Sequence, residues 1–175
     1  MPDCRTVLRG SAYPHRMSGA FDNEQEARSL YQAVGAVVVA GGHVEFRMHR
    51  LLAAIRGHKY PDLGITKKLG WSELATALRK EAHQSNHKLV LLTLMEREAG
   101  IKTLRNNVVH ACWRLDMGGP TAMRTYQGGS IATLVGSMSD LRAAAQRIFG
   151  FADELEALAV KHSQTQFPIA RPPLE

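Results

Sequence analysis

Three side chains between residues 105 and 110 have the types and the spacing needed for chemistry on a phosphate. Arg105, Asn106 and His110 lie in the segment 101–114, whose apolar residues recur at helical intervals. On a helix, Asn106 and His110 are one turn apart and point away from the apolar stripe, with Arg105 at its flank. An imidazole can take and give a proton near neutral pH, and a planar guanidinium suits a phosphate.

This set of groups matches what cleavage of an RNA backbone requires. The 2′-hydroxyl must lose a proton, the leaving 5′-oxygen must gain one, and the charge that develops on the phosphorus must be offset. Val109 and Trp113 add apolar area that the core stripe of this helix does not use, which is typical of a surface that meets a partner. We therefore expect a site and a dimer interface on the same helix.

The run Arg105-Asn106-Asn107-Val108-Val109-His110 resembles the signature of the HEPN superfamily, in which an Arg is followed by a polar residue and, after a short spacer, by a His. The helical pattern around it is similar over about residues 24 to 162. The resemblance implies a compact helical bundle that dimerises, with the two motif helices flanking a cleft. In catalytically active members it also implies a metal-independent endoribonuclease without a cofactor.

The resemblance assigns roles to the three residues. Arg105 would hold the scissile phosphate, His110 would transfer protons, and Asn106 would position the imidazole or the RNA. The expected partners are RNA and a second copy of the chain, with an antitoxin or another regulatory partner and a stress or defence role left open. One branch of the superfamily has Tyr two residues after the His as a modification site; Cys112 stands there in this chain, so that form of regulation is not supported.

Composition predicts one soluble domain. The chain has 175 residues, of which 45% are hydrophobic and 22% are charged, and its formal net charge is +6. A basic surplus favours polyanionic partners, nucleic acid first. Cys4 lies in the predicted flexible arm and Cys112 on a predicted helix, so we expect no disulfide between them and a reducing location. The polar first twenty residues lack a signal-peptide pattern, so we expect a cytoplasmic protein without a membrane span.

The predicted fold is all-α, a bundle of four to five helices with a small β-hairpin over 122–135 before the last helix. Residues 1–21 are predicted to form a flexible arm, 22–163 the helical domain and 164–175 a proline-containing tail. A first long helix is expected over about 24–55, with Gly41-Gly42 either kinking it or admitting another backbone. Three further helices are expected over 72–82, 87–98 and 101–114, with Gly100 ending the second of them. Ser72 is expected to cap the helix over 72–82, and Ser137 or Ser139 is expected to cap the last helix of the chain.

Two other groups bear on the site. Glu45 lies at the edge of the apolar stripe of the first helix and is predicted either to orient Arg105 or to form a structural ion pair with a nearby base. His83 and His87 are four residues apart, but the residues between them suggest a helix break and no third ligand is evident. We therefore expect no metal site.

Three hypotheses remain open at this point. The chain is an RNA-cutting enzyme, a non-catalytic RNA- or nucleotide-binding module in which Arg105 contacts phosphate, or a helical interaction protein whose Arg105 and His110 satisfy each other or Glu45.

Overall fold

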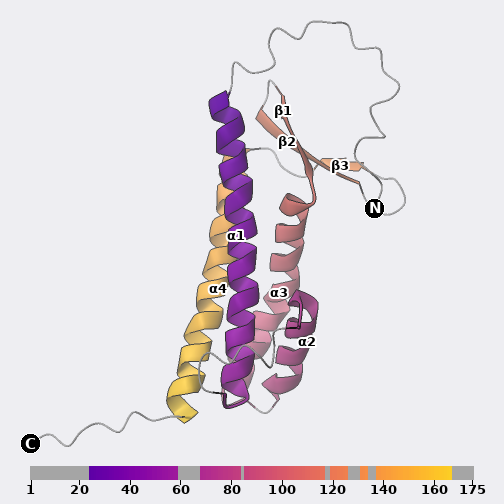
Figure 1. The fold of residues 1–175 in the computed structure, drawn as a ribbon. Coiled ribbons are helices and arrows are strands. Elements are labelled where there is room, and N and C mark those ends of the chain that lie inside the picture. The colour runs from indigo at the N-terminus through magenta and orange to yellow at the C-terminus, as the bar shows by residue number, and fades with distance from the viewer. Residues whose placement is uncertain are drawn as a thin grey trace, which may run out of the picture.

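The computed structural model describes residues 24–58, 68–83, 85–116, 119–125, 131–133 and 137–166. Most of them are helical (Figure 1). In chain order the elements are α1 (Glu24–Ile55), α2 (Trp71–Ala82), α3 (Lys88–Val109), β1 (Cys112–Asp116), β2 (Gly119–Thr125), β3 (Ile131–Thr133) and α4 (Met138–Gln166). The bundle of four helices agrees with the prediction; a fifth helix is not seen among the described residues. The predicted arm 1–21 lies outside them.

α1 and α4 are the two long helices, and they lie side by side along the whole bundle (Figure 1). They run in the same direction, since His43 stacks edge to face on Phe149 and, two turns further on, Arg50 pairs with Glu156. α2 and α3 form an antiparallel hairpin on the other side of α1. In the ranges given above, no helix combines the length and the apolar character needed to cross a bilayer.

The core forms where the sequence periodicity placed it. α1 buries a stripe at steps of three and four, and α4 buries a facing stripe. The largest fully buried side chains on these two helices are Val37, Met48, Leu51, Leu52, Leu141, Ile148, Phe151 and Leu155. Phe151 fills this core, whereas Phe149 is half-buried against His43. α4 continues to Gln166, into the predicted tail.

α3 differs from the prediction at both of its expected boundaries. It is one helix through Gly100, which has no left-handed backbone, because buried residues on both sides of Gly100, Met95 and Ile101 among them, pack into the same core. At the other end it stops at Val109 instead of continuing to residue 114. The Trp113 indole N–H donates a hydrogen bond to the Val108 carbonyl over 2.9 Å, which satisfies one of the free carbonyls at the helix end.

The residues after α3 enter a three-stranded antiparallel sheet of order β1-β2-β3. β2 and β3 lie in the region where the hairpin was predicted, with Met123 opposite Thr133 and Thr125 opposite Ile131. β1 was not predicted, because its residues were assigned to the end of a helix and the following turn. Its pairing with β2, Cys112 opposite Met123, explains why the helix ends.

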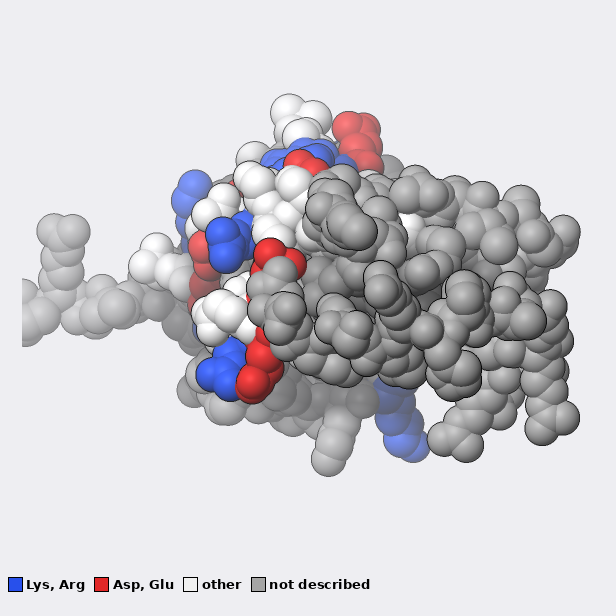
Figure 2. All heavy atoms as spheres, turned by 90° about the horizontal axis from the view of Figure 1, so that it is seen from above, with Lys and Arg blue, Asp and Glu red and all other residues white. Residues whose placement is uncertain are grey.

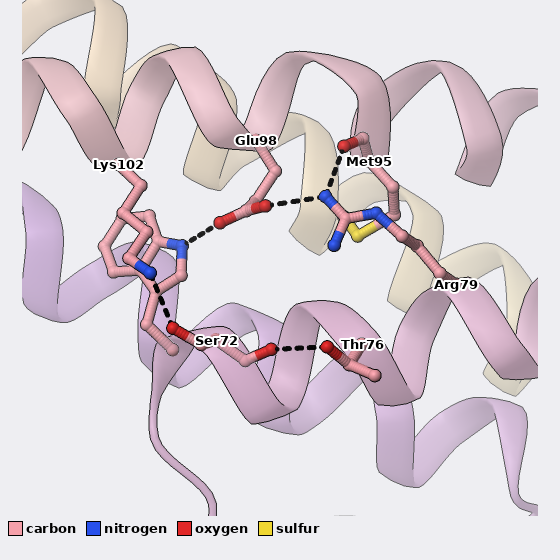
Figure 3. A network of polar contacts seen from close by, with 7 residues as sticks. Ser72, Thr76, Arg79, Met95, Glu98 and Lys102 are labelled. Atoms are coloured by element: carbon pink, nitrogen blue, oxygen red, sulfur yellow. Dashed lines mark hydrogen bonds and ion pairs between the residues drawn. The ribbon is translucent and has the colours of Figure 1, made fainter.

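A buried carboxylate fastens α2 to α3. Glu98 on α3 is 3% exposed, and its two oxygens accept hydrogen bonds from the Trp71 indole over 2.5 Å and from Arg79 over 2.8 Å (Figure 3). The Ser72 hydroxyl was predicted to cap α2, but it accepts a hydrogen bond from Lys102. Glu73 caps the helix instead, by accepting the Gly70 backbone N–H over 2.8 Å.

We expect Glu98→Ala to lower the free energy of unfolding by about 2–3 kcal/mol, because it leaves the indole N–H and the guanidinium without their shared acceptor. Urea denaturation measures this change. The matched control is Glu154→Ala, whose ion pair with Arg97 is nearly half exposed on both sides and should cost less than about 1 kcal/mol. Equal losses in the two variants would contradict the assignment.

The turn between α2 and α3 contacts the end of α4 through histidines. The Ser85 hydroxyl and His162 Nε2 are 2.8 Å apart, and the rings of His87 and His162 meet edge to face with centroids 4.9 Å apart. Burial lowers the pKa of His162, and the neighbouring His87 lowers it further. His162 is therefore neutral in the folded chain at neutral pH, and its packing depends on that state.

This pKa difference predicts a loss of stability in acid. The pKa of His162 is lower in the folded chain than its ordinary value of 6.5, so the unfolded chain binds the proton more readily and stability declines as the pH falls below 6.5. Urea unfolding at about pH 7.5 and 5.5 measures the decline. His162→Gln should remove part of it; His49, whose pKa burial also lowers, accounts for another part. The exposed His83, as His83→Gln, is the control, and an unchanged decline in His162→Gln would refute the prediction.

Candidate functional site

The side chain of Arg105 lies across α1 at Gly41. A Cβ built on Gly41 would be 3.0 Å from Arg105 Cγ and 3.2 Å from Arg105 Nε, closer than such atoms normally approach. Gly41 is itself buried, and only its lack of a side chain lets Arg105 pass. The Gly41-Gly42 pair was expected to kink α1 or to admit a backbone; the structure shows that Gly41 admits a side chain. The glycine pair in the sequence indicated a close approach at this position, but the sequence did not indicate that Arg105 is the group that approaches.

The guanidinium of Arg105 is held by its sequence neighbour. Its Nη1 donates a hydrogen bond to Asn106 Oδ1 over 2.9 Å. Its Nε is buried and has no hydrogen-bond partner among the described residues. A buried N–H without an acceptor is unfavourable. The position of Arg105 is therefore determined by packing on Gly41 and by Asn106, and not by a full set of acceptors.

His110 stands at the end of α3 with its side chain exposed. Its backbone N–H donates to the Asn106 carbonyl over 3.1 Å, which closes the last turn of the helix. Asn106 thus connects the two candidate catalytic groups, binding Arg105 by its side chain and His110 by its backbone. The structure brings the three predicted residues together at one end of α3, next to the sheet, with an accessible imidazole and a half-buried guanidinium.

Glu45 lies on α1 one turn after Gly41 and is half-buried. Among the described residues, no hydrogen bond or ion pair joins Glu45 to Arg105 or to another base. Its charge acts on His49, one turn further along α1, and raises the pKa of His49 against the larger lowering that burial causes. The predicted role of Glu45 in orienting Arg105 is thus not supported by a contact.

Val109 and Trp113, the predicted dimer interface, both pack against the core of their own chain and are half-buried. The prediction placed Trp113 on the same helix as His110, and this is wrong, because Trp113 belongs to β1. The indole lies back over the end of α3, where it bonds to the Val108 carbonyl. Part of the apolar area assigned to a partner is therefore used within the chain.

Over the part of this end that the structure describes, charge is mixed. Seen from the end where α1 begins, Lys and Arg lie next to Asp and Glu there (Figure 2). On that described part, a phosphate would therefore meet guanidinium groups that lie beside carboxylates. No group of three or more His, Cys, Asp or Glu that could hold a metal ion occurs among the described residues. Of the two histidines considered as metal ligands, His83 and His87, the ring of His87 packs on the ring of His162.

In comparisons with known proteins, no family model, no curated sequence and no solved structure matches this chain. The likeness to the HEPN superfamily therefore rests on the motif residues and on the helical pattern around them.

The contact between α1 and Arg105 gives a test of the site's construction. Alanine is more favourable than glycine inside a helix by about 1 kcal/mol, so Gly42→Ala, where a Cβ meets nothing within 4 Å, should stabilise the chain by up to that amount. Gly41→Ala should gain less or lose stability, because Arg105 must move. Urea denaturation measures both, and in an Arg105→Ala background the two gains should become equal. Equal gains in the native background would contradict this reading.

Proposed function

We propose that this chain is a metal-independent endoribonuclease of HEPN type, with Arg105, Asn106 and His110 as its site and a homodimer as its working form. The observation that supports it is the Arg105–Asn106 hydrogen bond one helical turn from an exposed imidazole. A phosphate-binding fork and a proton-transfer group are then on one rigid helix end, as catalysis by positioning requires.

The reaction would be an internal transesterification. The 2′-hydroxyl oxygen attacks the adjacent phosphorus and gives up its proton to a base, and the bond from phosphorus to the 5′-oxygen breaks. The 5′-oxygen takes up a proton, so the products are a 2′,3′-cyclic phosphate and a 5′-hydroxyl. His110 transfers a proton in this step, and in a dimer the His110 of the partner subunit could supply the second transfer.

The proposed role of Arg105 is electrostatic. Its permanent charge offsets the negative charge that develops on the phosphate oxygens during attack. Asn106 acts through Arg105, because its amide oxygen accepts one guanidinium N–H and so limits the rotation of the fork. We therefore assign Asn106 a positioning role, with Gly41 supplying the space. RNA is the proposed partner, and an antitoxin or other regulatory protein would act by covering this helix end.

The test is cleavage of a fluorescent single-stranded RNA in the presence of EDTA. His110→Ala and Arg105→Ala should each lower the cleavage rate by about a hundredfold or more, the usual size of a lost acid–base or charge-stabilising group. The matched controls are His83→Ala and Arg142→Ala, which remove exposed residues of the same types elsewhere on the chain. Wild-type cleavage that His110→Ala leaves unchanged would show that the activity belongs to another site or a contaminant.

The same RNA distinguishes the alternative of a binding module. Binding whose affinity falls steeply with salt and weakens in Arg105→Ala, without cleavage at any pH, would select the non-catalytic reading. Absence of both binding and cleavage would leave a helical interaction protein.

A further inference from the structure

α1 carries a second apolar face, on the side away from the core. No Lys, Arg, Asp or Glu occurs between Arg28 and Glu45. Within and just beyond this segment Tyr31, Val38, Val39 and Phe46 are exposed, by 75%, 42%, 54% and 37%. At about 100° per residue these side chains share one face of the helix with Gly35 and Gly42. We call these six residues the outer stripe.

The outer stripe is symmetric in residue class about its centre: a valine, a glycine and an aromatic residue follow at equal distances in both directions. The midpoint lies between Val38 and Val39; Gly35 and Gly42 are equally far from it, and so are the aromatic residues Tyr31 and Phe46. A contact between identical subunits about a two-fold axis must be self-complementary, with each residue meeting its counterpart reciprocally. A palindromic face on a straight element meets that condition when two copies cross in opposite directions at the midpoint.

The two glycines leave room for such a crossing. A Cβ built on Gly35 or on Gly42 would find nothing within 4 Å, so the space above both is open. Helices approach most closely where the facing residues are small, and the bulky Tyr31 and Phe46 would then pack at the two ends of the contact. The arrangement would set Val38 against the partner's Val39, Gly35 against the partner's Gly42 and Tyr31 against the partner's Phe46.

The charge distribution favours a second copy over other occupants. The chain has a net charge of +6, so two copies repel over most of their surfaces, whereas the outer stripe lets them meet without placing like charges in contact. An acidic partner would find no positive group between Arg28 and Glu45. A membrane-binding helix face is normally flanked by several Lys or Arg that can bind anionic lipid. The flanking arginines here, Arg28, Arg47 and Arg50, are engaged in ion pairs with Glu24 and Glu156 of their own chain.

We propose that two copies of this chain form an antiparallel dimer through the outer stripes of their α1 helices. From Tyr31 to Phe46 the contact would be about 22 Å long. A single helix pair of this length is a small interface, so we expect a dissociation constant in the micromolar range. The inference stands independently of RNA cleavage, because it uses none of the motif residues.

The dimer would also set the distance between the two candidate sites. Gly41, which accommodates Arg105, lies about 4 Å along the helix from the proposed two-fold axis, but it is buried and about 100° around the helix from Gly42. Each Arg105 would thus lie on the inner side of its own α1, one on either side of the axis. The main contact would be on α1 and not at Val109 and Trp113.

The experiment is sedimentation velocity of the full chain over a concentration series from about 1 to 200 μM, which brackets a micromolar dissociation constant. The wild type should pass from monomer to dimer, and Val38→Lys should weaken association at least about tenfold. Val160→Lys is the matched control, because Val160 is the same residue type with 40% exposure on α4. Circular dichroism verifies that each variant keeps its helices.

A charge exchange tests the direction of the pairing. In the double variant Val38→Lys with Val39→Glu, an antiparallel dimer sets each new lysine opposite a new glutamate of the partner, and association should recover; a parallel dimer would set like charges together. The proposal is overturned if the wild type stays monomeric throughout the series, if Val160→Lys dissociates it equally, or if the double variant fails to recover. The RNA assay is scored separately. A dimer on this surface that does not cleave RNA would overturn the proposed nuclease alone, and a chain that stays monomeric would overturn both this inference and the homodimer proposed above.

Discussion

The passage of Arg105 across Gly41 connects most of what is described above. It brings the end of α3 against the middle of α1, and it does so at a residue where any side chain would collide with the guanidinium stem. Because the arginine is fixed by packing, it loses little conformational freedom when it binds a phosphate, which is the usual advantage of a preorganised site. The neighbouring Asn106 and the exposed His110 depend on the same helix end, so the geometry of the candidate site follows from this one crossing.

Stability and chemistry are separated along the bundle. The His87–His162 ring contact lies at the end where α2 turns into α3, and the Glu98 carboxylate lies at the middle of α3; together they join α2, α3 and α4. Arg105 and His110 lie toward the other end, near the sheet (Figure 1). An exposed imidazole and a guanidinium with an unsatisfied N–H add little to folding, and a tightly bonded opposite end makes up for them.

The parts of the fold that depend on local periodicity were predictable. The boundaries of α1 and the buried stripes of α1 and α4 follow from apolar spacing, since these helices bury one continuous face. The end of α3 was not predictable in this way, because Cys112 to Asp116 leave the helix to pair with β2, a contact that depends on residues further along the chain. Gly100 was misread for a related reason: packing on both sides of it outweighs its intrinsic preference to end a helix.

The sequence indicated which residues form the candidate site, but it did not indicate which groups hold them in place. Arg105, Asn106 and His110 were chosen by spacing, and the structure places them at one helix end. Glu45 was predicted either to orient Arg105 or to form a structural ion pair with another base, because a carboxylate near an apolar stripe suggests a buried ion pair. The orienting groups in the structure are a glycine and an amide. A glycine's function depends on what occupies the space where its side chain would be, which a single sequence does not reveal.

The shared direction of α1 and α4 has an electrostatic consequence. Neighbouring helices usually run in opposite directions, so that their macrodipoles partly cancel; here the two longest helices add theirs, with both partial positive poles toward the sheet end of the bundle. Glu24 and Glu26 in the first turn of α1 and Asp140 in the first turn of α4 offset those poles. Each such carboxylate contributes about 0.3–1 kcal/mol at low ionic strength. These acids therefore belong to the balance that lets two long helices lie parallel, and salt, which screens them, weakens the dipole repulsion at the same time.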